Sequence, residues 1–348
     1  MGLIEHLIQQ LEAMKGDLHA QAAAAAEFLV SSQPEATREA LRPALDAAAV
    51  LRWFDAGLLG KVLEIPEDEA RARFEMASAL PFVETYRGHG REGRNLHEST
   101  RLGWRKRLAR EAPERFRLLS GRAAACFAGD VSVGGRIEWI YHLVCGDPDR
   151  GGTELEKLDR EWSGSARPED RYTLAAALKE LEDSRLLQGR ARVWALLSIA
   201  WTRVSRGEEA QLTNVAQEVL ELARSLGDQR SEADAQCLLG DVLEAQGKLA
   251  EAQAAFGEYL RISRRLAEQD PTNACWQREL AVACLRMARL RRRLGSPVAA
   301  LPLYEEAGRI FAALVERAPG FAEWARDKAD ADEEVARCRA ECAEVQGA

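Results

Sequence analysis

The sequence predicts an all-α fold, in which an N-terminal helical domain with one short β-hairpin is followed by stacked pairs of helices. The main observation is an internal repeat: residues 247–283 return 48 residues later as 295–331, with 13 of the 37 aligned positions identical. A period of this length is typical of helical repeat arrays, whose units cover the hydrophobic faces of their neighbours. The composition agrees, because Ala, Leu, Glu and Arg dominate while aromatic residues reach only 6%.

The 348 residues are enough for two or more domains. From the breaks in the pattern we expect four parts. They are a helical extension (1–37), a domain of short helices and a hairpin (38–128), a helical connector or capping repeat (129–190), and the repeats (191–348).

The second part contains three helical patterns in quick succession, over 41–53, 56–63 and 68–80. The period then changes: residues 81–86 alternate like a strand, 88–93 form a glycine-rich turn, and 95–97 return as a second strand. Three short helices followed by a hairpin is the layout of a winged helix, so we predict that fold for residues 38–128.

The repeated segment carries the spacing of the tetratricopeptide pattern, with small residues where the two helices of a pair touch. One copy consists of Leu239, Gly240, Leu243, Gly247, Ala252 and Phe256, and the next of Met287, Ala288, Gly295, Ala300 and Tyr304. A weaker earlier copy fits Ile199, Ala200, Gly207, Leu212 and Ala216. We therefore predict a tetratricopeptide-like α-solenoid with at least three helix pairs. The late position of Pro271 and Pro319 indicates a lengthened second helix.

Several short motifs match those of bacterial signal-transduction ATPases of the STAND class. They are residues 51–55 (LRWFD), 81–84 (PFVE), 96–98 (LHE) with Arg101, and 270–274 (DPTNA) with 276–278 (WQR). Over residues 40–335 the chain resembles the C-terminal part of these proteins, where a winged helix joins a nucleotide-binding module to tetratricopeptide repeats. The resemblance implies a bacterial regulatory or defence setting.

Catalytic and cofactor motifs have little support in this sequence. A GxxxxGK[ST] phosphate loop is missing, since Gly60-Lys61 is followed by Val62. Gly88, Gly90 and Gly93 match GxGxxG, but they lie between two strands rather than between a strand and a helix. His142 and Cys145 have ligand-like spacing without the second pair that a structural zinc needs. We expect no enzyme activity, no metal and no cofactor.

The first helix of each pair lines the concave groove of a tetratricopeptide array, and this groove is the candidate binding site. We expect it to present Trp194, Leu197 and Trp201 in the first unit, Asp234, Asp241 and Glu244 in the second, and Arg289, Arg292 and Arg293 in the third. Tryptophans are common anchors for peptides, and guanidinium groups bind carboxylates. The alternative is that the tryptophans are core residues and the arginines a solvated face.

A basic segment lies at residues 87–122, with 11 Lys or Arg against four Asp or Glu in a chain of net charge −8. Its candidate patch comprises Arg87, Arg91, Arg94, Arg101, Arg105, Lys106 and Arg107. Such a patch could contact DNA phosphates or an acidic protein surface. The presumed recognition helix argues for protein, because Glu67, Asp68, Glu69 and Glu75 outnumber its basic residues.

The sequence thus favours a non-catalytic adaptor or sensor that binds a partner protein or peptide in the repeat groove. The alternative is a winged-helix DNA-binding regulator with a repeat sensing domain. No run of 18 apolar residues and no secretory signal is found, so we expect a cytoplasmic protein without membrane contact. The oligomeric state stays open.

Overall fold

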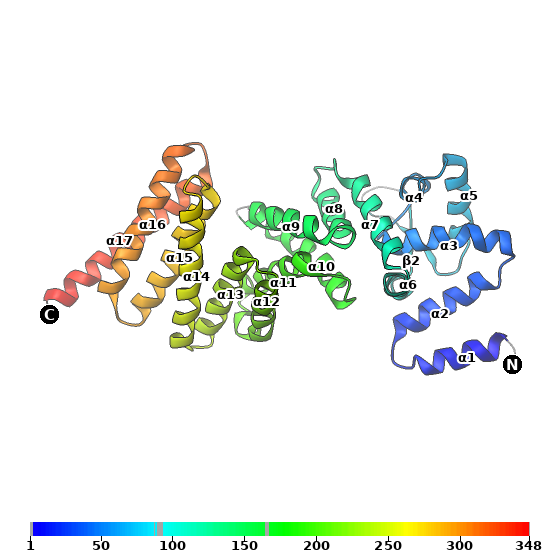
Figure 1. Ribbon diagram of the computed structural model, residues 1–348, viewed down its shortest axis with the longest axis horizontal. Coiled ribbons are helices and arrows are strands. Elements are labelled where there is room, and N and C mark those ends of the chain that lie inside the picture. The colour runs from blue at the N-terminus through cyan, green and yellow to red at the C-terminus, as the bar shows by residue number, and fades with distance from the viewer. Residues whose placement is uncertain (1–2, 87, 89–92, 164–166, 348) are drawn as a thin grey trace. The chain divides into compact units, whose positions relative to one another are not determined.

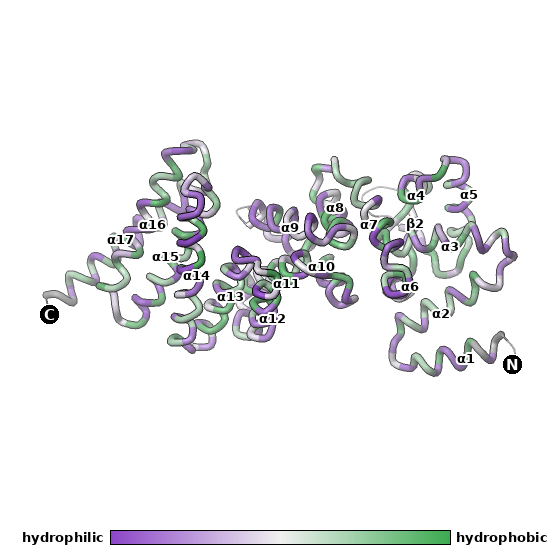
Figure 2. Tube along the Cα trace, in the orientation of Figure 1, coloured by the Kyte–Doolittle hydropathy of each residue, from purple (hydrophilic) through white to green (hydrophobic). Residues whose placement is uncertain are grey.

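The computed structural model describes residues 3–86, 88, 93–163 and 167–347, which are mostly α-helical (Figure 1). They form two compact units: residues 1–159 with 172–195, and residues 160–171 with 196–348. The division falls inside α9 (Pro148–Ser163), α10 (Pro168–Asp183) and α11 (Gly189–Val204). Hydrophobic and hydrophilic residues alternate along the helices of both units (Figure 2). The four-part division of the chain stays a prediction.

The first unit contains eight further helices besides its shares of α9 to α11, within the residues that are described. They are α1 (Leu3–Ala13), α2 (Leu18–Ser31), α3 (Glu35–Val50), α4 (Ala56–Leu63), α5 (Glu67–Ser78), α6 (Glu98–Glu111), α7 (Pro113–Phe127) and α8 (Val133–Gly146).

The predicted hairpin is present between α5 and α6. Strand β1 (Val83–Tyr86) pairs antiparallel with β2 (Gly93–Leu96), so that Val83 lies opposite Leu96. Phe54 adds an isolated antiparallel bridge to Arg94. The sequence pattern predicts the first of the three short helices over residues 41–53, but the corresponding helix, α3, ends at Val50. It ends there because Leu51 is extended and the chain turns to reach the bridge at Phe54.

A buried charged cluster joins α6, α8 and α10 in the first unit. Glu180 binds Arg101 Nη2 at 2.6 Å and Arg105 Nη2 at 2.9 Å, and it accepts a hydrogen bond from the Tyr141 hydroxyl. We call these four residues the Glu180 cluster. Burial by itself raises the pKa of Glu180, but the hydrogen bond from Arg101 and the two positive charges outweigh it and lower that pKa to about 2. Burial lowers the pKa of Arg105 to about 10.

The second unit is a row of antiparallel helices in which each helix contacts the next, from α12 to α17. Its members are α12 (Thr213–Ser225), α13 (Gln229–Ala245), α14 (Leu249–Gln269), α15 (Ala274–Arg293), α16 (Pro297–Arg317) and α17 (Ala322–Gly347), with the short 3-10 helix η2 (Glu209–Gln211) before α12. This is an all-α, solenoid-like arrangement of helix pairs.

The repeated glycines close the first helix of each pair with the same turn. Gly207, Gly247 and Gly295 have φ angles of 76°, 74° and 74°. In each turn the amide after the glycine donates to the carbonyl five residues earlier, as Lys248 does to Leu243 at 2.9 Å and Ser296 to Arg291 at 3.0 Å. Left-handed backbone favours glycine because it lacks a Cβ.

Aromatic residues fill the space between paired helices. Phe256 of α14 and its repeat counterpart Tyr304 of α16 are both fully buried. A Cβ added at Gly240 would lie 2.4 Å from the Phe256 ring, so the facing position has to be small. The small residues of the tetratricopeptide pattern therefore have a packing role in this chain.

Candidate functional site

The candidate site lies on α13, α15 and α17, the first helices of successive pairs in the second unit. Two of them begin at side-chain caps: Asp228 accepts from the Ser231 amide at 3.2 Å, and Asn273 accepts from the amides of Cys275 and Trp276 at 3.1 and 3.2 Å. Each of these helices buries an apolar stripe, exemplified by Val242 on α13. The polar positions between the stripe residues are left to face neighbouring helices or solvent.

Ion pairs connect these polar positions from one repeat to the next. We call the set the charge ladder. Between α13 and α15 it contains Asp241–Arg286 at 2.9 Å and Glu244–Arg293. Between α15 and α17 it contains Arg278–Asp327 at 2.7 Å, Arg289–Glu334 at 3.3 Å and Arg292–Glu334 at 2.8 Å. In the ladder α15 supplies the arginines and both neighbours supply the carboxylates.

The two sides of the ladder differ in exposure. Arg286, Arg289 and Arg293 have side chains that are 37%, 45% and 56% exposed. Their partners Asp241, Glu334 and Glu244 are 8%, 14% and 20% exposed. These three arginines are therefore more exposed than the carboxylates that bind them, whereas Arg278 and Arg292 are only 28% and 22% exposed.

Asp241 is the most buried carboxylate of the ladder. Burial raises its pKa to about 6, against the lowering effect of the Arg286 charge, and the nearby Glu244 raises it further. One of its carboxylate oxygens, Oδ2, has no hydrogen-bond partner among the described residues. At neutral pH the Asp241–Arg286 pair therefore contributes less stability than its short distance suggests, because burial disfavours the ionised carboxylate.

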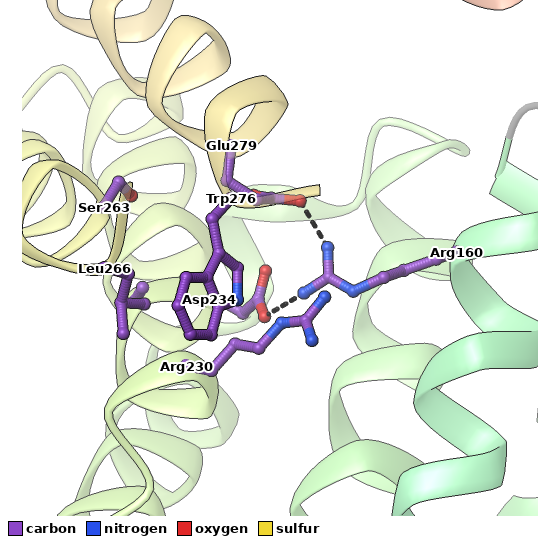
Figure 3. Close-up of a pocket in the computed structure, with 8 residues that line it drawn as sticks. Arg160, Arg230, Asp234, Ser263, Leu266, Trp276 and Glu279 are labelled. Atoms are coloured by element: carbon purple, nitrogen blue, oxygen red, sulfur yellow. Dashed lines mark hydrogen bonds and ion pairs between the residues drawn. The ribbon is translucent and has the colours of Figure 1, made fainter. Parts of the chain in front are cut away.

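Arg160, at the end of α9, binds two further carboxylates in the second unit (Figure 3). Its Nη2 lies 2.9 Å from Asp234, and its Nη1 contacts Glu279. Glu279 also accepts a hydrogen bond from the Tyr259 hydroxyl at 3.0 Å. Burial alone would raise the pKa of Glu279, but the Arg160 charge and the Tyr259 hydrogen bond lower it below its usual value.

The cavity beside Arg160 is too small for an organic ligand. It encloses about 10 Å³ between Arg160, Trp276, Ser263 and the residues around them, which is room for about one water molecule. Trp276 Nε1 and Ser263 Oγ have no hydrogen-bond partner among the described residues. We interpret the cavity as a small gap in the packing.

The residues predicted for the aromatic part of the groove are buried or partly buried. Trp194 and Leu197 on α11 are buried, and Trp201 is partly buried against the core of the second unit. Their spacing of three and four residues places them on the apolar stripe of the helix. The alternative interpretation, in which the tryptophans are core residues, describes Trp194 correctly.

The charged residues predicted for the groove lie on the expected helices but are not isolated. Asp234, Asp241 and Glu244 on α13, and Arg289, Arg292 and Arg293 on α15, all form ion pairs. Sequence reasoning missed Arg286, Glu334, Arg160 and Glu279, which complete those pairs. A signal existed, because the ladder partners are separated by 42 to 49 residues, close to the 48-residue period.

The predicted basic patch is not one continuous surface. Arg101 and Arg105 are buried in the Glu180 cluster, where they neutralise a carboxylate that the sequence pattern did not connect to them. Arg107 binds Glu27 at 2.8 Å, and Arg94 donates to the Gly93 carbonyl at 3.0 Å. Arg87 and Arg91, together with Gly90 of the GxGxxG match, lie outside the described residues. Among the described members of the patch, Arg94 and Lys106 form no ion pair.

The described residues contain no group of three or more His, Cys, Asp or Glu side chains that could hold a metal ion. In the same part of the chain, no helix is both long enough and apolar enough to cross a membrane.

Fold and site together define an all-α protein built on stacked helix pairs. No family model matches the chain, and no curated protein matches it. Among solved structures, BtubC (BKLC) from P. vanneervenii is similar at 15% identity and a TM-score of 0.39, covering 66% of this chain and 93% of that one. A Signal Transduction ATPase with Numerous Domains (STAND) protein with a tetratricopeptide repeat sensor, from Pyrococcus horikoshii, is similar at 12% identity and a TM-score of 0.37, covering 90% of this chain and 55% of that one. At this level of similarity, neither structure indicates a function for this chain.

Proposed function

We propose that this chain is a non-catalytic adaptor whose tetratricopeptide-like repeats bind an acidic segment of a partner protein. The observation that carries the proposal is that Arg286, Arg289 and Arg293 are more exposed than the carboxylates that bind them. Such a surface attracts carboxylates and repels cationic segments.

The ladder does not need to break for a partner to bind. A guanidinium group has five N–H donors, and each ladder pair uses only one or two of them. A carboxylate from a partner can therefore accept a second, charge-assisted hydrogen bond from an arginine that already binds Glu334 or Glu244. The internal carboxylates hold each guanidinium in place before the partner arrives, which lowers the entropy cost of binding.

For the N-terminal part we propose a winged helix. Helices α3, α4 and α5 are followed by the β1–β2 hairpin, and the bridge between Phe54 and Arg94 supplies a third short strand segment. In the adaptor this domain would couple partner capture to an effector or to self-assembly. The STAND resemblance of the sequence motifs supports a bacterial regulatory or defence setting.

Two features of the first unit argue against the alternative function, DNA binding by the winged helix. Arg101 and Arg105 bind Glu180 inside the first unit and are not available to phosphates. The first turn of α5 carries Glu67, Asp68 and Glu69, which repel DNA.

The adaptor proposal is tested by reversing the charge of the exposed arginines. We expect the double variant Arg289→Glu, Arg293→Glu to bind its partner at least tenfold more weakly than the wild type, about 1.4 kcal/mol. The partner is first identified by quantitative affinity purification from cells that express the chain, and the affinity is then measured by calorimetry with the purified protein.

The matched control is Arg261→Glu, Arg309→Glu, which makes the same charge change on the second helices α14 and α16. If charge reversal unfolds the repeats, the double variant Arg289→Gln, Arg293→Gln, which only removes the two charges, replaces the charge-reversal variant. Equal affinity of the wild type and both groove variants for every captured protein would refute the proposal.

A further inference from the structure

A second cavity, unrelated to the charge ladder, lies in the first unit between α6, α7, the start of α9 and the end of α10. It has a volume of about 440 Å³, within the usual size range of small-molecule sites. Its lining contains four basic residues and no acidic one: Lys106, Arg110, Arg117 and Arg185. We call it the basic cavity.

Most of the positive charge in the basic cavity is uncompensated. No described residue forms an ion pair with Lys106, Arg117 or Arg185. Arg110 binds Glu111 at 2.7 Å, but both side chains are more than half exposed, so solvent screens this pair. The acids closest in sequence to Arg185 are engaged elsewhere, since Asp183 binds Lys179 and Glu182 binds Arg192.

The backbone adds to the positive potential of this cavity. Pro113, the first residue of α7, lines it, as does Pro148, the first residue of α9; the start of α9 is already capped by Asp147, which accepts from the Arg150 amide at 3.1 Å. The N-terminal end of a helix carries partial positive charge and exposes amides that favour anions. The N-cap residue of α7, Ala112, makes no side-chain cap hydrogen bond to those amides.

Neutral groups complete the wall of the basic cavity. Ser184 is more than nine-tenths buried, lines the cavity, and its hydroxyl has no hydrogen-bond partner among the described residues. Cys145 also lines the cavity, and burial raises the pKa of its thiol to about 12, so it brings no negative charge. Phe116 and Leu186 supply apolar surface.

Arg185 itself occupies an unusual backbone position. Its φ angle is +55°, a left-handed conformation that glycine adopts without strain and arginine does not. The turn is held by the Leu186 amide, which donates to the Leu181 carbonyl at 3.0 Å. A cation therefore stands at the rim of the cavity where the backbone alone would favour glycine.

We propose that the basic cavity binds a small organic phosphate carrying at least two negative charges. Three unpaired cations exceed what a single carboxylate can neutralise, whereas a phosphate group accepts several charge-assisted hydrogen bonds. Ser184, a lining residue with a hydroxyl donor, could add one more. The volume is larger than one phosphate needs, and Phe116 with Leu186 provides a surface for the organic part of the ligand.

Isothermal titration calorimetry of the whole chain with pyrophosphate and with ADP at low salt tests this proposal. We expect saturable binding of both, weakening as salt rises, with ADP the tighter ligand because its nucleoside covers the apolar wall. The variant Arg117→Glu, Arg185→Glu should bind each at least tenfold more weakly. Ser184→Ala should cause a smaller loss.

The matched control is Arg71→Glu, Arg261→Glu, which changes the net charge equally at two exposed arginines away from the cavity. It should bind like the wild type, and thermal unfolding verifies that all variants are folded. Absence of saturable binding would overturn the proposal, as would equal affinity in the cavity variant or equal loss in the control. Binding of pyrophosphate without ADP would overturn the organic part of the ligand assignment.

Discussion

The Glu180 cluster and the charge ladder solve the same problem, the placement of charges between helices, in opposite ways. In the cluster one carboxylate receives two guanidinium groups and a tyrosine hydroxyl, and both arginines are buried. In the ladder the charges are spread along three helices, and although Glu334 also binds two arginines, Arg286, Arg289 and Arg293 are 37 to 56% exposed. The cluster fixes three helices at a single point, whereas the ladder leaves a surface that a partner can reach.

This difference has an energetic consequence. Removing one member of a buried group leaves its partners charged and desolvated, which is far more costly than the group's net contribution. Removing one exposed member of a pair lets water replace the lost contact. The cluster should therefore respond strongly to a single substitution, and the ladder only weakly.

The largest effect is expected for Glu180→Gln, which leaves Arg101 and Arg105 without a counter-charge. We expect a loss of about 3 to 5 kcal/mol in the free energy of unfolding, measured by urea denaturation at pH 7. The pKa of Glu180 falls from 4.5 to about 2 on folding, so its contribution is complete above pH 4.5 and is lost as the pH falls towards 2. The difference between variant and wild type should shrink over that window.

Asp183→Asn on the same helix is the control for this prediction, because its ion pair with Lys179 is exposed. It should change stability by less than about 0.5 kcal/mol. A Glu180→Gln protein within the same narrow range would show that the cluster is not the structural centre described above.

Asp241→Asn should have an intermediate effect of opposite sign. Because the pKa of Asp241 is raised from 3.8 to about 6 by burial, the folded protein gains stability from protonation below pH 3.8 and loses it as the pH rises through 6. Asparagine resembles the protonated acid, so the variant should be more stable than the wild type by up to about 3 kcal/mol at pH 8 and nearly equal at pH 4. Thermal and urea unfolding at both pH values would measure this, and a variant less stable at pH 8 would mean that the bond to Arg286 outweighs burial.

Arg293→Ala should have the smallest effect, a loss of less than about 1 kcal/mol that decreases with added salt. The measurement is again urea unfolding, at low and high salt. A larger loss of unfolding free energy that persists in high salt would show that the ladder pairs are as sensitive to substitution as the cluster.

The repeat architecture could be predicted from the sequence because its signals are local. Gly247 and Gly295 mark turns that need a left-handed backbone, and Phe256 and Tyr304 mark the filled space between paired helices. Such residues have the same role in every copy, so the period of 48 residues reveals them.

The site could be predicted only in part, because the state of a charge depends on partners far away in the chain. Arg101 and Arg105 belong to a basic segment in the sequence, but Glu180, 79 and 75 residues later, removes them from the surface. The sequence pattern predicts Trp194 as an anchor for a partner, but its side chain is buried in the core. For Arg293 and Glu244 the separation of 49 residues was a usable signal, since opposite charges one repeat apart meet on adjacent first helices.

The alternation of the ladder also limits how such an array can grow. Helix α13 contributes acids, α15 arginines and α17 acids again, so the electrostatic period is two repeats although the sequence period is one. Duplicating a single unit would place arginines against arginines or acids against acids, whereas duplicating two units together would restore every pair. Inserting an even number of repeat units should therefore give a folded, longer array, whereas inserting an odd number should place like charges against each other and destabilise it.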